Sequence, residues 1–177
     1  MAALSALPDN FIPTEPGWLH FVDIADPTQP RLVRSLAIPA LAVDSADGLI
    51  YVALERQVRI YDPLSGLEVG WFPTADTITG LRLTGGRAYV ALNSALEIYD
   101  VTVRPAVRLG RLAGQFGAEL LGRVQMELDG TTLFVAKTQG MVTVNVANPA
   151  APMLLGQQPT ARPATRALVL DGGGNAV

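Results

Sequence analysis

Short segments in which hydrophobic and polar residues alternate run along most of the chain. Three of them, at 49–54, 87–92 and 133–137, read LIYVAL, RAYVAL and LFVAK, and each follows a turn pair: Asp47-Gly48, Gly85-Gly86 or Asp129-Gly130. Alternation with a period of two, enriched in β-branched and aromatic residues, is typical of half-buried β-strands. The spacing of amphipathic helices is absent, so the pattern predicts an all-β fold.

A second alternating segment follows each of these strands and ends at an Asp or Asn. The segments read VRIYD at 58–62, LEIYD at 96–100 and VTVN at 142–145, and LHFVD at 19–23 belongs to the same set. Their last residues, Asp23, Asp62, Asp100 and Asn145, are separated by 39, 38 and 45 residues. A period near 40 residues with four short strands per unit is typical of propeller blades. We therefore predict a β-propeller of four-stranded antiparallel blades.

The repeat divides the chain into an N-terminal extension at 1–17 and propeller blades at 18–177. The predicted strands lie at 19–24 and 31–38; at 40–44, 49–54, 58–61 and 67–72; at 80–83, 88–92, 96–99 and 107–112; at 123–128, 132–136, 141–146 and 153–157; and at 166–170. This amounts to about four blade equivalents with a half-blade at both ends. A half-built sheet exposes edges that invite pairing. We expect self-association through these edges or ring closure within the chain, and we favour further blades of a longer protein.

Within the repeat, equivalent residues are expected to face the same side of each blade. Val52, Val90 and Val135 occupy one position of the second strand, next to Tyr51, Tyr89 and Phe134. We expect the three valines to be buried between neighbouring blades, since a slip of one residue would exchange the two faces.

Two stretches of the sequence resemble the LVIVD repeat, in which the named strand is followed by an Asp/Asn-Pro turn and a second Pro. They are WLHFVDIADPTQPRLVRSL at 18–36 and MVTVNVANPAAPMLLG at 141–156, while DPLSG at 62–66 is more similar to the turn of related YVTN-type repeats. The resemblance covers residues 18–177. It implies a propeller from a bacterial or archaeal protein, often exported or surface-attached, and implies no particular chemistry.

Composition removes several function classes. The chain has 13 Lys and Arg against 16 Asp and Glu, and its arginines are scattered, which argues against a nucleic-acid partner. Although 49% of the residues are hydrophobic, no apolar run approaches the ~20 residues that a membrane-spanning helix needs, so no membrane insertion is expected. The N-terminal residues lack the pattern of a signal peptide. Export would therefore need a leader that this sequence does not contain.

The inventory of reactive side chains is small. With no Cys and His20 as the single histidine, thiol nucleophiles, cysteine zinc sites and histidine clusters are excluded. We predict no catalytic residue, no metal ligand and no cofactor. His20 is expected to be a partly exposed strand residue, and Glu97 and Glu127 are expected to face outwards or to be paired.

Three motifs that suggest ligand binding are better explained as turns. The repeated Asp23, Asp62 and Asp100 are expected to accept backbone N–H bonds in Asx turns, because Asn145 at the fourth position serves a turn equally well. The segment DSADG at 44–48 lacks the twelve-residue calcium loop and predicts a hairpin. The segment GGG at 172–174 lacks the Lys-Ser/Thr of a phosphate loop and predicts a turn.

One loop face remains as a candidate for ligand recognition. An insertion at 113–121 breaks the period, and insertions in repeat folds usually lie on one face. The turns between second and third strands lie on that face as well. Its candidate ligand residues are Glu55, Arg56, Asn93, Glu119 and Lys137.

The sequence therefore favours a non-enzymatic binding or scaffold module that recognises protein or glycan through this face. The alternative is the propeller portion of a hydrolase or quinoprotein-like oxidoreductase whose reactive residues lie outside this chain.

Overall fold

The computed structural model describes residues 2–6, 17–114, 116, 124–137 and 140–159. In these residues the chain forms β-strands joined by turns. The first sheet contains β1 (Ala2–Ala6), β2 (Trp18–Asp23) and β3 (Arg31–Ala37). The other sheets contain β4 (Ala42–Ala46), β5 (Leu49–Ala53), β6 (Gln57–Tyr61) and β7 (Glu68–Pro73); β8 (Ile78–Thr84), β9 (Arg87–Leu92), β10 (Ala95–Asp100) and β11 (Val107–Ala113); and β12 (Gln125–Asp129), β13 (Thr132–Lys137), β14 (Gly140–Asn145) and β15 (Met153–Pro159).

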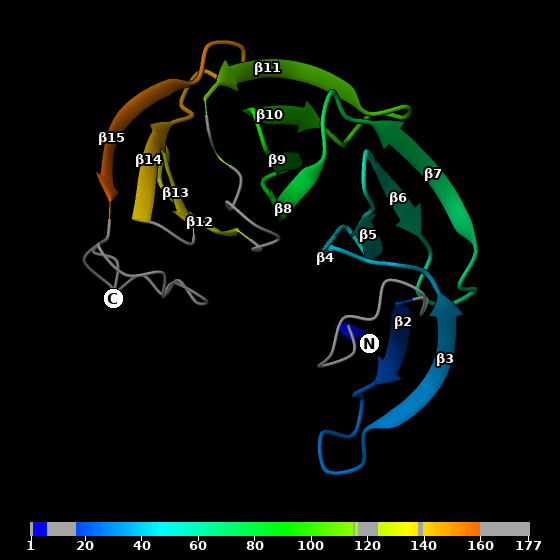
Figure 1. The fold of residues 1–177 in the computed structure, drawn as a ribbon. Coiled ribbons are helices and arrows are strands. Elements are labelled where there is room, and N and C mark those ends of the chain that lie inside the picture. Colours follow the sequence, from blue (N-terminus) through cyan, green and yellow to red (C-terminus); the bar gives the residue numbers. More distant parts are fainter. Residues whose placement is uncertain (1, 7–16, 115, 117–123, 138–139, 160–177) are drawn as a thin grey trace.

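The four antiparallel sheets stand side by side around an arc, as the blades of a propeller do (Figure 1). We number them blade 1 (β1–β3), blade 2 (β4–β7), blade 3 (β8–β11) and blade 4 (β12–β15). In each four-stranded blade the first strand lies innermost and the last lies outermost, because every strand pairs with the next one along the chain. The predicted propeller of four-stranded antiparallel blades is confirmed.

Blade 1 contains a strand that the sequence pattern does not predict. The pattern assigns residues 1–17 to an extension, whereas β1 pairs with β2 from Ala2 opposite Val22 to Ala6 opposite Trp18. The segment AALSA has no β-branched or aromatic residue, so its strand conformation has little local support and depends on pairing with β2. The expected strand at 166–170 and the turn at 172–174 lie outside the described residues.

The link between the last two strands is built in the same way in all four blades. The register shifts at equivalent places: between Phe21 and Val22, Ile60 and Tyr61, Ile98 and Tyr99, and Thr143 and Val144. Such bulges increase the local twist and bend the strand. The side chains of Asp23, Asp62, Asp100 and Asn145 then each accept the backbone N–H two residues further on, at 2.8–3.0 Å. The predicted Asx turns are confirmed.

The hairpin between the first two strands of blade 2 is equally local in origin. Asp47 and Gly48 have φ values of 51° and 74°, and both lie in the left-handed region. Two consecutive positive φ values give the hairpin turn whose twist matches that of the flanking strands. The hairpin predicted at 44–48 is therefore confirmed.

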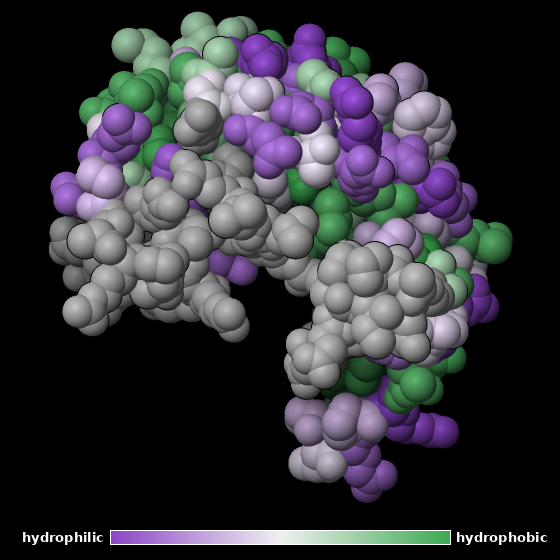
Figure 2. Space-filling model, in the orientation of Figure 1, coloured by the Kyte–Doolittle hydropathy of each residue, from purple (hydrophilic) through white to green (hydrophobic). Residues whose placement is uncertain are grey.

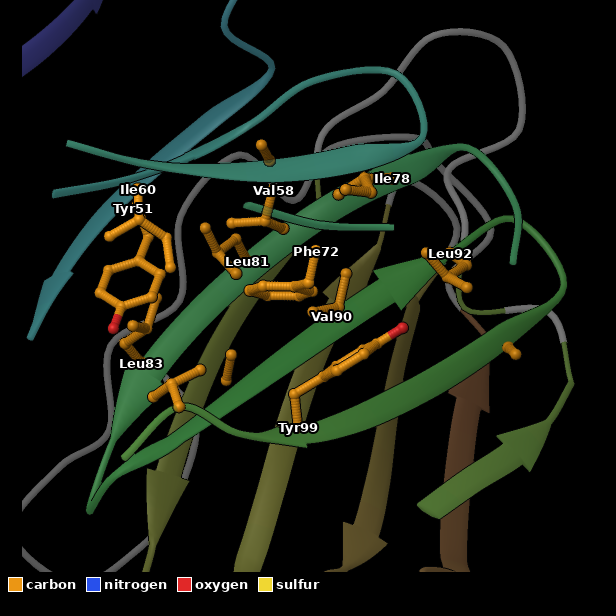
Figure 3. Packing of buried hydrophobic residues seen from close by; sticks show 14 residues of the cluster. Tyr51, Val58, Ile60, Phe72, Ile78, Leu81, Leu83, Val90, Leu92 and Tyr99 are labelled. Atoms are coloured by element: carbon orange, nitrogen blue, oxygen red, sulfur yellow. The ribbon is translucent and has the colours of Figure 1, made fainter. Parts of the chain in front are cut away.

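The hydrophobic core lies between the blades. Val52, Val90 and Val135 are fully buried, as predicted from the repeat. Tyr51 of blade 2 packs in one cluster with Val90 of blade 3, and Tyr89 of blade 3 packs with Val135 of blade 4. The aromatic residue of each pair thus faces the following blade and the valine faces the preceding one. Figure 3 shows the cluster between blades 2 and 3, where the rings of Phe72 and Tyr99 lie 4.6 Å apart.

Part of the apolar content lies on the outside of the arc rather than in the core. The outermost strands expose large hydrophobic side chains, among them Leu32 on β3, Trp71 on β7, and Met153, Leu154 and Leu155 on β15. Figure 2 shows apolar surface near β15, at the upper left of the molecule. The high hydrophobic content of the sequence therefore comes from the outermost strands as well as from the core.

Candidate functional site

The loop face predicted from the sequence lies where the β5–β6 and β9–β10 turns meet the loop that leads into β8. Glu55, Arg56 and Asn93 are exposed there, Lys137 is half-buried at the end of β13, and Glu119 lies outside the described residues. The β5–β6 turn and the loop are bonded to each other: Ile78 N–H donates to the Glu55 carbonyl at 2.8 Å and the Arg56 guanidinium donates to the Ala75 carbonyl at 2.7 Å. We call this surface, comprising residues 55–56, 74–77 and 93–94, the loop rim.

Asp76 connects the β9–β10 turn, at residues 93–94, to the rest of the loop rim. Its carboxylate accepts the Ser94 hydroxyl at 2.8 Å and the Thr77 N–H at 2.7 Å, and these hydrogen bonds hold the pKa of Asp76 below its ordinary value. The Asn93 N–H donates to the Thr77 carbonyl at 3.1 Å. Because backbone and side-chain bonds join all three segments, the loop rim has a defined shape.

A polar pocket of about 250 Å³, which the sequence pattern does not predict, lies on the inner side of the arc. It is formed by the innermost strands of three consecutive blades. The lining residues are Leu41, Ala42, Val43 and Asp44 from blade 2, Leu81 and Arg82 from blade 3, and Val124, Gln125, Met126 and Glu127 from blade 4. We call it the inner pocket.

Three charged residues in the inner pocket occupy one position of the repeat. Asp44, Arg82 and Glu127 lie directly opposite Tyr51, Tyr89 and Phe134 in the first strand pairs of their blades. They are separated by 38 and 45 residues, the same intervals that separate Asp62, Asp100 and Asn145. This shared spacing was available in the sequence and could have brought the three residues together.

Arg82 is the centre of the charged group. Its Nη2 donates to Glu127 Oε2 at 2.8 Å, and its Nη1 lies 3.8 Å from Asp44 Oδ2. The same Asp44 oxygen accepts the Leu83 N–H of β8 at 2.7 Å. Arg82 Nε is buried and has no hydrogen-bond partner in the described part of the chain. Glu127 is therefore paired, as predicted, but it is paired inside a pocket.

A glycine allows the inner strands of blades 3 and 4 to approach closely. A Cβ at Gly80 would lie 2.7 Å from the Val124 carbonyl oxygen, closer than real side chains come. The Val124 N–H donates to the Thr79 carbonyl at 2.9 Å and joins the two strands. This approach places Arg82 within hydrogen-bond distance of Glu127.

A second charged group lies between blades 2 and 3, away from the inner pocket. Glu97 is fully buried, and its carboxylate lies 2.6 Å from Arg108 Nη1 and 3.7 Å from Arg111 Nε. The Tyr99 hydroxyl contacts the other carboxylate oxygen at 2.7 Å and the Pro73 carbonyl at 3.0 Å. Burial and the contact with Glu97 raise the pKa of Tyr99 far above its ordinary value, so the phenol stays protonated and can donate. This group joins blade 3 to the end of β7.

The other single residues have structural surroundings. His20 is partly exposed, as predicted, and its Nδ1 lies 2.8 Å from the Ser35 hydroxyl on the neighbouring strand. Among the described residues no group of three or more His, Cys, Asp or Glu side chains is arranged to hold a metal ion. In that same part of the chain no helix has the length and apolar character needed to span a membrane.

Comparisons with known proteins agree with this architecture. The family model described as LVIVD repeat matches residues 127–160, which span β13, β14 and β15. No curated protein matches the sequence.

Two solved structures share the fold at low sequence identity. One is the hydrazine synthase of Kuenenia stuttgartiensis, with a TM-score of 0.69 and 19% identity over 89% of this chain. The other is the computationally designed Ika8 protein, with a TM-score of 0.62 and 13% identity over 87% of this chain. The chain spans 47% of the length of each. Together with the blades, these matches show a β-propeller fold, in which residues 127–160 match the LVIVD repeat.

Proposed function

We propose that this propeller is a non-enzymatic binding module that holds its ligand in the inner pocket. The observation that carries the proposal is the charged group of Asp44, Arg82 and Glu127. Equivalent positions of three blades contribute one residue each, and all three side chains remain partly exposed in the pocket. A concave site with a few convergent polar groups is the usual form of a ligand site.

The contacts within the charged group favour ligand binding, because they hold its carboxylates in place. Glu127 is held by Arg82 at 2.8 Å, and Asp44 is held by the Leu83 amide at 2.7 Å. Both contacts come from strands of the scaffold rather than from loops, so the groups are oriented before a ligand arrives. Orientation in advance lowers the entropic cost of binding.

The loop rim extends this site for a larger partner, either a protein or a glycan. The loop that carries Thr77 leads directly into β8, and the Thr79 carbonyl near the start of β8 accepts the Val124 N–H beside the inner pocket. Exposed Glu55, Arg56 and Asn93 supply charged and polar groups along the rim. The resemblance to LVIVD-repeat proteins supports a role in an exported or surface-associated bacterial protein.

The proposal is tested by amide NMR on the isotope-labelled 177-residue chain. The probes are neutral methyl glycosides, small amines and small carboxylates, each titrated separately. We expect at least one class to shift amide signals of β4, β8 and β12 saturably. The variant Ala42→Phe enlarges a residue that lines the inner pocket, and it should abolish these shifts.

Ala25→Phe is the matched control, because Ala25 is exposed on a distant turn. It should leave binding unchanged. If no probe class binds, or if the shifts persist in Ala42→Phe, the inner pocket is not the ligand site.

A further inference from the structure

The unused hydrogen-bonding groups of the inner pocket define the chemistry of its ligand. Arg82 carries five N–H donors. Among the described residues, one of its nitrogens makes a hydrogen bond, to Glu127 at 2.8 Å. Its contact with Asp44, at 3.8 Å, is too long for a hydrogen bond. Because the Arg82 side chain is 36% exposed, its terminal N–H groups can donate to an acceptor that a ligand brings into the pocket.

The carboxylates in the same pocket require donors from the ligand. In the described part of the chain, Glu127 accepts Arg82 through one oxygen, and its second oxygen has no described donor. The Glu127 side chain is 33% exposed and the Asp44 side chain is 20% exposed, so both border the accessible space. A ligand that fits this pocket must therefore donate and accept within a few ångströms.

Charge argues against anionic ligands. The group contains two carboxylates and one guanidinium, so its net charge is −1. A ligand carboxylate next to Arg82 would lie close to Asp44 and Glu127. Like charges brought together at an interface cost several kcal/mol. Neutral hydroxyl groups avoid this penalty, because each can donate one hydrogen bond and accept two.

We propose that the inner pocket binds a neutral polyol about the size of one sugar unit, with neighbouring hydroxyls that accept from Arg82 and donate to Glu127 and Asp44. This inference rests on the proposed binding function and names its ligand class. The volume of about 250 Å³ suits one ring rather than a drug-sized molecule, for which pockets span roughly 300–1,000 Å³. A longer glycan would continue from this ring to the loop rim.

The test compares ring compounds of matched size that differ in charge. Titration calorimetry and ligand-detected NMR on the full 177-residue chain would use methyl glucoside, methyl galactoside and myo-inositol, with glucosamine as the cation and glucuronate as the anion. We expect at least one neutral compound to bind with a Kd on the order of 1 mM, the range for about a dozen heavy atoms. Glucuronate should bind at least about tenfold more weakly.

Two variants test the contacts. Glu127→Gln and Asp44→Asn retain the side-chain shape, and each should weaken binding of the neutral compound by roughly tenfold, the effect of one lost charge-assisted hydrogen bond. The control is Glu68→Gln, because the Arg59–Glu68 pair on the outer side has side-chain exposures of 38% and 36%, close to those of Arg82 and Glu127. Thermal unfolding of each variant would verify that it is folded. If only one of the two pocket variants folds, its binding measurement alone is enough for the test.

The outcomes separate this inference from the proposed function. If only glucosamine or glucuronate binds, and the pocket variants weaken that binding, the polyol assignment is wrong and the binding function stands. If a neutral compound binds equally well to both pocket variants, it lies elsewhere and the assignment is wrong. If no compound of any class binds, both proposals fail.

Discussion

Asp44, Arg82 and Glu127 differ in charge although they occupy one position of the repeat. The residues opposite them, Tyr51 and Tyr89 in blades 2 and 3, are identical and buried, and Phe134 is a third aromatic residue. Side chains that pack between blades are thus repeated, whereas those that border the inner pocket are individual to each blade. The repeat supplies the scaffold, and its exceptions supply the candidate site.

The buried Glu97 should contribute to stability through its arginine partners. Glu97→Gln should lower the free energy of unfolding by about 1–3 kcal/mol, since it removes a buried charge that Arg108 holds at 2.6 Å. The effect should stay below the loss at a fully buried pair, because the Arg108 side chain is 48% exposed and retains water. Denaturant unfolding at neutral pH measures the change.

Glu68→Gln again provides the control, because the exposed Arg59–Glu68 pair is 3.4 Å apart. Its effect should lie within about 0.5 kcal/mol. Equal losses in the two variants would show that the buried position of Glu97 adds nothing.

The valines between the blades should each carry part of the core energy. Val90→Ala should cost about 1–3 kcal/mol, the range for losing part of a buried aliphatic side chain. Val69→Ala on β7 should be close to neutral, because Val69 is 42% exposed. Denaturant midpoints of the two variants decide the matter, and a neutral Val90→Ala would contradict the assigned packing.

At the scale of elements, the Asx turns fix the links between the last two strands of the blades. Asp100 accepts both the N–H of Thr102 at 2.9 Å and its hydroxyl at 2.6 Å, and these bonds hold the pKa of Asp100 below its ordinary value of 3.8. A lowered pKa in the folded state means that the carboxylate stabilises the fold above this value. The stabilisation is lost as the pH falls through the folded-state pKa.

We expect the melting temperature at pH 7 to decrease in the order wild type, Asp100→Asn, Asp100→Ala. The amide retains an acceptor, as Asn145 does in blade 4 at 2.9 Å, and alanine retains none. The difference between wild type and Asp100→Asn should shrink as the pH falls from about 3.8 toward the lower folded-state pKa, at which the native carboxylate becomes protonated. Thermal unfolding at several pH values checks this, and a constant difference would exclude a role for the charge.

At the scale of the whole molecule, the described blades form an arc with unequal ends. Tyr51 and Tyr89 each face a following blade and are 1% exposed. Phe134, the equivalent residue of blade 4, is only half-buried. The solved propellers of similar fold are about twice as long, since the chain spans 47% of each. Phe134 is thus more exposed than its two counterparts, which a following blade covers.

We expect the isolated 177-residue chain to self-associate through its end blades, with two copies sharing one ring. Light scattering after size exclusion should give a molar mass twice 18.7 kDa. In a longer protein, further blades of the same repeat would take the place of the second copy. A monomer that unfolds cooperatively at all concentrations would contradict this expectation.

The sequence by itself determined the features that repeat or that depend on neighbours in the chain. Alternation and a period near 40 residues predicted the blades, the Asx turns and the burial of Val52, Val90 and Val135. These features have local causes, because strand alternation sets which face a residue occupies and an Asx turn closes within three residues.

Only the tertiary structure decided which strands and which blades meet. β1 is a strand because β2 pairs with it, Glu97 is buried because the arginines of β11 and the chain after β7 enclose it, and the inner pocket forms because three innermost strands converge. The inner pocket and the contact of Glu97 with blade 2 depend on the distance and angle between separate sheets. Local alternation carries no information about either quantity.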